Sequence, residues 1–368
     1  MAAPNSTLWP YEPHTNAKHE ILRRYLQAWF PILDKYYDRL VYLDGFAGPG
    51  EYEGGEPGSP LIVLDLALHH THTLTGESVF IFVELKEDRY QHLEEIINRI
   101  RQQLPPNFKV YVENNEFSVV LAEALDDLDQ KGLRIAPTFA FIDPFGFSGV
   151  PMSLIHRLLQ RDRTEAFILF PIDSVNRFVL HPEEEIRRHM ATLFGTEEVF
   201  DAVAQPDRRR ALRKLYQDKL SEAAKFVRFF TMRDKTDKPI YDLFFASNNR
   251  LGHVKMKEAM WLVDEAGTFT FSDATDPLQS VLFTADPSPR LAQEIIQGGA
   301  ERKNIEVSRI TSWVEESTPY LRKHMIAALK LAEQKGKIHV HPVKATGKKR
   351  RKGTFPDDAI IDFLSAGS

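Results

Sequence analysis

The sequence contains no cysteine among its 368 residues. Disulfides, thiolate zinc sites, iron–sulfur clusters held by this chain and a cysteine nucleophile are therefore excluded. No apolar run approaches the roughly 20 residues of a membrane-spanning helix. The first ten residues have neither the basic start nor the apolar core of a secretory signal. We expect a cytoplasmic protein without a membrane span, and no metal site is predicted.

Charge is distributed unevenly along the chain. From Asp276 to the end there are 15 Lys and Arg against 11 Asp and Glu, and before it 32 against 41, so the two parts carry +4 and −9. A chain of this length suits a large domain and a smaller one better than a single core. Acids and prolines accumulate at 273–289 and indicate a boundary. We predict domains at 1–275 and 276–368.

An apolar run that ends in an acid and a glycine turn opens the predicted α/β domain. Val41–Leu43 indicates a buried parallel strand, and the glycines let the following backbone pass close to a ligand. The spacing is G-x-x-G-x-G, which does not favour the pyrophosphate of a dinucleotide. Phe-Ala-Gly-x-Gly instead resembles motif I of S-adenosylmethionine (SAM) methyltransferases. The alternative is a turn that binds nothing. The candidate cofactor residues are Asp44, Gly45, Phe46, Ala47, Gly48 and Gly50.

The next two predicted strands also end in polar residues. Val79–Val83 is followed by Glu84, which is placed to accept hydrogen bonds from a ribose. Lys109–Glu113 is followed by Asn115, which would lie near an adenine edge. Ordinary loop chemistry accounts equally well for an Asn at that point, because Asn favours turns and helix starts.

A second polar turn follows the fourth predicted strand, 138–142. Its sequence Asp143-Pro144-Phe145-Gly146 resembles the Asp-Pro-Pro-Tyr motif of amino-methyltransferases, in which the acid and a backbone carbonyl orient an amine and the aromatic ring stacks on a base. Gly146 replaces the aromatic residue, so stacking would pass to Phe145 or Phe147. Ligands of open α/β sheets bind outside the carboxyl ends of the strands, so we expect this turn and the glycine turn to face one crevice.

Polar residues at two further places are weaker candidates. After the fifth predicted strand, 165–172, Asn176 and Arg177 would contact a substrate, with Arg177 holding a phosphate or carboxylate. Pairing of Arg177 with Glu183 or Glu184 is an equal alternative. A helix predicted from Asn16 to about Phe30, capped by Thr15, has His14, Lys18 and His19 near its start. We interpret that end as solvated rather than as an anion site.

The last part of the sequence carries the pattern of a winged helix-turn-helix. Runs 225–232 and 240–246 form a predicted hairpin that adds antiparallel strands at the edge of the sheet. Beyond the boundary, three helices precede two strands that flank a basic loop. In one interpretation the cations of this basic loop bind nucleic-acid phosphates. In the other they are solvated, and the module binds protein. The cations are Lys348, Lys349, Arg350, Arg351 and Lys352.

Taken together, these motifs resemble the three-Cys-motif partner protein family (TcmP). The resemblance covers nearly the whole chain and includes His14-Thr15 with Lys18, the glycine turn, Gly58-Ser59-Pro60, 141–146, Asn176-Arg177, 256–261 and 354–356. It implies a Rossmann-like methyltransferase domain followed by a winged helix, and a radical-SAM-like partner protein with three cysteines. A chain without cysteine is compatible with a complex in which the partner protein supplies the cysteines.

The sequence is compatible with two functions. The first is a SAM-dependent methyltransferase that acts on an amine, with nucleic acid as one candidate acceptor and Asp143 orienting the amine. The second is a scaffold without catalysis that binds a partner protein or DNA. Gly146 in place of the motif's aromatic residue favours the second.

Overall fold

The computed structural model describes residues 6–146, 150–264, 267–274, 286–300 and 302–364. The chain divides into two compact units, residues 1–263 with 270–277 and residues 264–269 with 278–368. Within the described ranges, no helix is long and apolar enough to cross a membrane.

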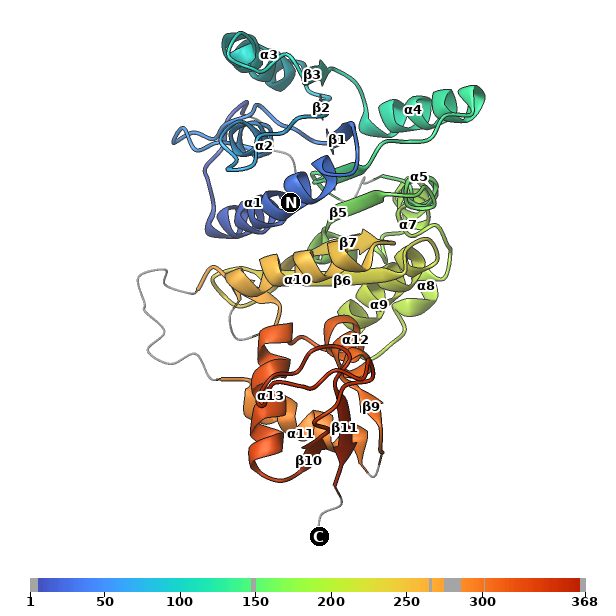
Figure 1. Cartoon of the computed structure of the whole chain (residues 1–368). Coiled ribbons are helices and arrows are strands. Elements are labelled where there is room, and N and C mark those ends of the chain that lie inside the picture. Colours follow the sequence, from blue (N-terminus) through green and yellow to red (C-terminus); the bar gives the residue numbers. More distant parts are fainter. Residues whose placement is uncertain (1–5, 147–149, 265–266, 275–285, 301, 365–368) are drawn as a thin grey trace. The chain divides into compact units, whose positions relative to one another are not determined.

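An eight-stranded sheet forms the centre of the first unit (Figure 1). Its strands are β1 (Arg39–Asp44), β2 (Glu77–Val83), β3 (Phe108–Glu113), β4 (Thr138–Ile142), β5 (Thr164–Phe170), β6 (Phe226–Arg233), β7 (Pro239–Ser247) and β8 (Thr270–Ser272). The order is β3-β2-β1-β4-β5-β7-β6-β8, and β7 alone among these strands runs antiparallel to its neighbours. This confirms the predicted Rossmann-like methyltransferase sheet. The predicted edge hairpin is β6 and β7, but β7 lies inside, next to β5, and β8 forms the edge.

The central strands are apolar because helices cover both faces of the sheet (Figure 1). Every residue of β4 and β5 is buried, which explains why these strands read as continuous apolar runs rather than alternating ones. One face is covered by α1 (Pro13–Asp34), α2 (Ser59–Leu68), α3 (Glu87–Arg101) and α10 (Arg250–Val263). The other is covered by α4 (Phe117–Lys131), α5 (Met152–Leu159), α6 (Ile172–Phe178), α7 (Glu184–Phe194), α8 (Val199–Ala202) and α9 (Arg208–Ser221).

Helix α1 is longer at both ends than the sequence predicts. It begins at Pro13, with Glu12 rather than Thr15 at the N-cap position, and it continues through Pro31 to Asp34. Proline suits the first turn of a helix, where its missing N–H costs nothing. Pro31 is tolerated inside the helix where neighbouring Trp29 and Phe30 are buried against the sheet, so packing outweighs the local penalty.

The second unit contains α11 (Ser288–Gly299), β9 (Ile305–Glu306), α12 (Val307–Ser317), α13 (Arg322–Gln334), β10 (Ile338–Val340) and β11 (Ile360–Phe363). Its strands form an antiparallel sheet in the order β10-β11-β9. Three helices thus precede the pair β10 and β11, in the order the sequence predicts. Assignment as a winged helix stays a prediction.

Candidate functional site

The glycine turn is fixed to the strands on either side of β1. The Gly45 N–H donates to the Phe141 carbonyl of β4, and the Ala47 N–H donates to the Val83 carbonyl of β2, each at 2.9 Å. The Gly48 N–H donates to Glu84 Oε2, also at 2.9 Å. The turn is therefore held rigidly at the carboxyl ends of three adjacent strands.

The three glycines of the turn serve different purposes. A Cβ on Gly45 would stand 2.7 Å from the ring of Phe117, and one on Gly50 would stand 2.8 Å from Leu93. Packing inside the chain therefore requires both of these glycines. Gly48 has φ +63° and faces the pocket, where a Cβ would approach the ring of Trp9 to 3.3 Å. Gly48 is thus the glycine whose missing side chain leaves room for a group in the pocket.

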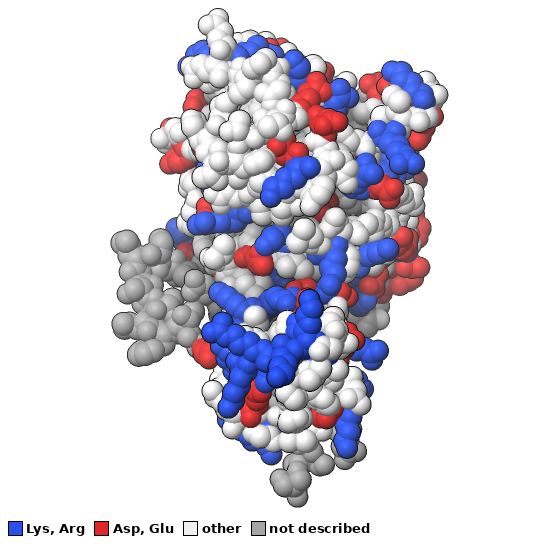
Figure 2. All heavy atoms as spheres, viewed as in Figure 1, with Lys and Arg blue, Asp and Glu red and all other residues white. Residues whose placement is uncertain are grey.

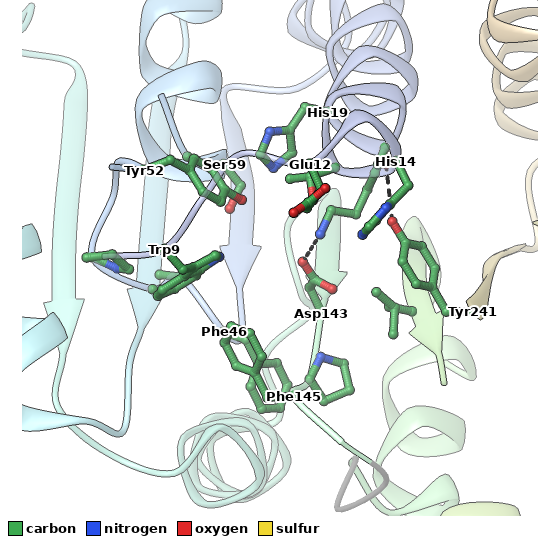
Figure 3. Close-up of a pocket in the computed structure, with 18 of the residues that line it drawn as sticks. Trp9, Glu12, His14, His19, Phe46, Tyr52, Ser59, Asp143, Phe145 and Tyr241 are labelled. Carbon is green, nitrogen blue, oxygen red and sulfur yellow. Dashed lines mark hydrogen bonds and ion pairs between the residues drawn. The ribbon is translucent and has the colours of Figure 1, made fainter. Parts of the chain in front are cut away.

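A pocket lies at the carboxyl ends of β1 and β4, as the sequence predicts for its two polar turns (Figure 3). The lining includes Phe46, Ala47, Gly48 and Gly50 from the first turn, and Asp143, Pro144 and Phe145 from the second. The start of α1 and the strand β7 complete its wall. The cavity measures about 160 Å³.

Asp143 is ion-paired with Lys18 of α1, as the dashed line in Figure 3 marks. The Lys18 side chain is 7% exposed, and His14 and His19 are also buried. Interpretation of this helix start as a solvated surface was therefore wrong. Since α1 begins at Pro13, these three residues face the pocket. Burial, with nearby Lys18 and Arg23 adding to it, holds the pKa of His19 well below its ordinary value, so the ring is neutral.

Asp44 lies fully buried beneath the glycine turn. Its Oδ1 accepts the Phe46 N–H at 3.3 Å, and its carboxylate also hydrogen-bonds with Ser59, which lines the pocket. Burial raises the pKa of Asp44 to about 7, although the hydrogen bonds from Ser59 and Phe46 act in the opposite direction. Asp44 therefore supports the turn from below and titrates close to neutrality.

Aromatic rings form the walls of the pocket (Figure 3). The Trp9 ring meets Phe145 edge-on at 5.4 Å and Tyr52 at 5.7 Å. The guanidinium of Arg89 lies 4.8 Å from the centre of the Trp9 ring and 5.3 Å from that of Phe145. Phe145 thus lines the pocket, and its role in stacking on a base stays a prediction. Phe147 lies outside the described residues.

Neither Glu84, predicted for the ribose, nor Asn115, predicted for the adenine, is among the residues that line the pocket, although Glu84 is bonded to the turn through Gly48. Glu84 is buried, and its two oxygens accept the N–H groups of Gly48 and Lys86. Burial raises its pKa. Asn115 is exposed and caps the following backbone by accepting the Glu116 N–H, which is the loop chemistry considered above.

Asn176 and Arg177 lie on α6 and are not among the residues that line the pocket. Arg177 pairs with Asp173 at 2.9 Å, not with Glu183 or Glu184 as the sequence alternative proposed. One helical turn separates the two, so the pair is local. Asn176 accepts a hydrogen bond from Arg208 Nε at 2.7 Å. Neither side chain is placed to touch a molecule inside the pocket.

Of the five cations predicted for the basic loop between β10 and β11, Arg350 is engaged internally. Arg350 pairs with Glu333 at 2.7 Å and lies over the ring of Phe355. The others, which we term the wing cations, are the exposed Lys348, Lys349, Arg351 and Lys352. Figure 2 shows Lys and Arg side chains gathered over this loop. The loop therefore offers four cations rather than five.

Several residues of the pocket were not predicted from the sequence. They include Trp9, Tyr52 and Tyr241, together with Lys18 in its contact with Asp143. The polar cluster at the start of α1 was a usable signal, because the rest of that helix is apolar where it meets the sheet. Tyr241 carried no such signal, since it is one apolar residue within a strand.

Comparisons with family models and with curated proteins find no match, so the resemblance to the three-Cys-motif partner family stays a prediction. Among solved structures, a Legionella pneumophila protein of family model DUF519 is 14% identical, with 68% of this chain and 92% of that one covered and a TM-score of 0.38. The DszA carbon methyltransferase is 12% identical, with 65% and 56% covered and a TM-score of 0.37. This chain thus spans little more than half of that enzyme.

The plantazolicin methyltransferase BpumL, solved in complex with SAH, is 10% identical, with 64% of this chain and 86% of that one covered and a TM-score of 0.28. At these identities and TM-scores, the likeness does not bear on the activity of this chain.

Proposed function

We propose that this chain is a SAM-dependent methyltransferase whose acceptor is an amine. The observation that carries the proposal is that the glycine turn after β1 and the Asp143 turn after β4 line one pocket. These are the two stretches whose sequences resemble the cofactor and acceptor motifs of amino-methyltransferases. A bound SAM supplies the activated methyl group, and the protein aligns the acceptor with it.

The residues of the pocket fit a cofactor at the glycine turn. Gly48 lines the pocket, and within 4 Å a Cβ there would meet the ring of Trp9 and no other group of the chain. Gly48, with Phe46, Ala47 and Gly50, would hold the methionine part. Glu84 would hold the ribose, because each of its oxygens retains acceptor capacity beyond its bond to a backbone N–H. Asn115 would lie near the adenine.

The Asp143 turn would hold the acceptor. The carboxylate of Asp143 and the backbone carbonyl of Pro144 accept hydrogen bonds from the acceptor N–H groups and turn the nitrogen lone pair toward the methyl group. Lys18 fixes the position of the Asp143 carboxylate through their ion pair. Phe145 stacks on the acceptor ring, and the aromatic walls keep water away from the reacting atoms.

The acceptor and partner follow from the predicted family and second unit. We propose that the amine belongs to nucleic acid, because the wing cations supply charge that suits phosphates. A radical-SAM-like protein with three cysteines would act as the partner, contributing cluster chemistry that a cysteine-free chain does not hold.

The test is transfer of labelled methyl groups from SAM to DNA, RNA and the partner protein. Wild type is expected to label one of these acceptors, and Asp143→Asn is expected to lose the transfer while it still binds SAM. An Asp143→Asn variant with undiminished transfer would contradict the assigned role.

A second function, a scaffold without catalysis, is favoured by one feature of the pocket. The chain's own side chains occupy positions that a ligand would use, since Trp9 stands over Gly48 and Lys18 pairs with Asp143. If this function is correct, SAM does not bind at the glycine turn, with or without the partner.

A further inference from the structure

A cluster of cations lies at the rim of the first unit, around a single carboxylate. Asp173 accepts from Arg177 at 2.9 Å and from Arg209 at 3.1 Å, and it pairs with Lys238 at 2.7 Å. Arg208 is held next to them by its bond to Asn176. We term these four cations the rim cluster: Arg177, Arg208, Arg209 and Lys238.

The rim cluster carries more positive charge than its own acids neutralise. Asp173 serves three of the cations, and Asp207, which shares a surface hollow with Arg208 and Arg209, caps α9 through the Arg210 N–H. Asp234 also lies close to Lys238 and accepts its backbone N–H, so four cations stand against three carboxylates. Burial works to raise the pKa of Asp173, but the bonds from Lys238 and Arg177 outweigh it, and the pKa lies below its ordinary value.

The side chains of the rim cluster are accessible to a ligand. Arg177 is 62% exposed and Lys238 46%, and Arg208 and Arg209 line an open hollow of about 520 Å³. Guanidinium groups present several N–H donors in a plane and bind phosphate oxygens in pairs, which favours phosphate as the ligand of such a surface.

None of the four cations lines the candidate acceptor pocket, but two residues of its wall lie close in sequence to the rim cluster. Pro171 and Ile240 line the pocket wall, and Asp173 and Lys238 are each two residues away along the chain. The bond between Asp173 and Lys238 closes the rim between β5 and β7 at this point. A molecule that fills the pocket with one part can therefore rest an adjoining anionic part on the rim cluster.

We propose that the rim cluster binds the phosphate backbone of single-stranded nucleic acid while one of its bases enters the pocket. In a nucleotide, base and phosphate are joined covalently, which matches an aromatic pocket with cations at its edge. The strand is single because a base whose amine is to be reached has to leave a duplex stack. This inference rests on the proposed function and deepens it by assigning phosphate contacts to the first unit as well as to the wing.

The test is the salt dependence of binding to labelled single-stranded DNA and RNA, followed by fluorescence anisotropy without SAM. The rim variant is Arg208→Gln/Arg209→Gln/Lys238→Gln. A matched control removes equal charge at cations paired within their own helices: Arg24→Gln/Lys131→Gln/Lys255→Gln. Each phosphate contact to a single strand contributes about 0.7 to the slope of log K against log salt. We therefore expect the rim variant to lower the slope by about 2 and the control to leave it unchanged.

A second variant, Arg177→Gln/Lys238→Gln, changes exposed side chains only and is expected to lower the slope by about 1.4. It keeps the test valid if changes at Arg208 and Arg209 disturb α9. Wild-type slopes in both variants, or no binding by wild type, would overturn the proposal. So would displacement of the oligonucleotide by poly-glutamate of equal charge concentration, which would assign the surface to an acidic protein. The assay contains no SAM, so a loss of oligonucleotide binding is distinguished from a loss of cofactor binding.

Discussion

Asp44 is expected to make the stability of the first unit fall as the pH rises through neutrality. Burial raises its pKa from 3.8 to about 7. Between these two values the folded chain binds a proton that the unfolded chain has released, so the free energy of unfolding decreases with rising pH. From pH 5 to pH 8 the contribution of this single carboxylate amounts to about 2 to 3 kcal/mol.

The substitution Asp44→Asn removes the titration and keeps the shape of the side chain. Urea unfolding of variant and wild type across this pH range measures the effect as a difference, in which other titrating groups cancel. Relative to wild type, the variant is expected to gain about 2 to 3 kcal/mol between the acidic and the basic end.

The control is Asp129→Asn. Hydrogen bonds from Arg161 and Arg157 lower the pKa of Asp129, so it is ionised in both the folded and the unfolded chain, and the effect of its replacement stays constant with pH. If wild type and Asp44→Asn show parallel profiles, the buried carboxylate does not titrate near neutrality and the reasoning is refuted.

Three further predictions concern the pocket and the wing. Trp9→Phe should abolish the change in tryptophan fluorescence that SAH causes, since the Trp9 ring stands over Gly48; an undiminished change would place the ligand elsewhere. Lys18→Met should lower the rate of methyl transfer more than the affinity for SAH, because it removes the ion pair that positions Asp143; equal loss of both would indicate general damage to the pocket. Neutralising the four wing cations should lower the salt slope of single-strand binding by about 3; an unchanged slope would indicate a protein-docking module.

The sheet was predictable because its signals are local. Each central strand is an apolar run that closes on an acid or a turn, and burial on both faces produces that pattern. The positions of Asp44 and Asp143 at one end of the sheet then follow from parallel pairing of β1 with β4. The strand β8 was not predicted, because its three residues are too few to show a period.

The rest of the site depends on contacts between distant segments. Lys18 and Asp143 are 125 residues apart, and Tyr241 donates to the carbonyl of His14 from 227 residues away. Trp9 reaches the pocket only because the segment before α1 lies across the glycine turn. The Trp9 carbonyl accepts a hydrogen bond from the N–H of Glu53, just after that turn. No spacing within one stretch reveals such contacts.

The arrangement around Asp173 shows the same limit. Arg177 has carboxylates of Glu183, Glu184 and Asp173 within a few residues in sequence, and helical spacing alone does not choose among them. Packing of α9 and the start of β7 against α6 brings Arg209 and Lys238 to Asp173 as well. The rim cluster therefore becomes visible only in three dimensions.

Calorimetric titration with SAH tests the cofactor site most directly, on wild type and two glycine variants, each alone and with the partner protein. Gly48→Ala and Gly132→Ala place a Cβ at similar φ values, +63° and +60°, but the Cβ at Gly132 meets nothing within 4 Å. Both variants should lose about 1 to 2 kcal/mol of stability from the backbone alone. We predict saturable binding by wild type and Gly132→Ala, and binding at least about tenfold weaker by Gly48→Ala, equivalent to about 1.4 kcal/mol. Absence of binding in every case, or equal binding by all three proteins, would contradict a SAM site at the glycine turn.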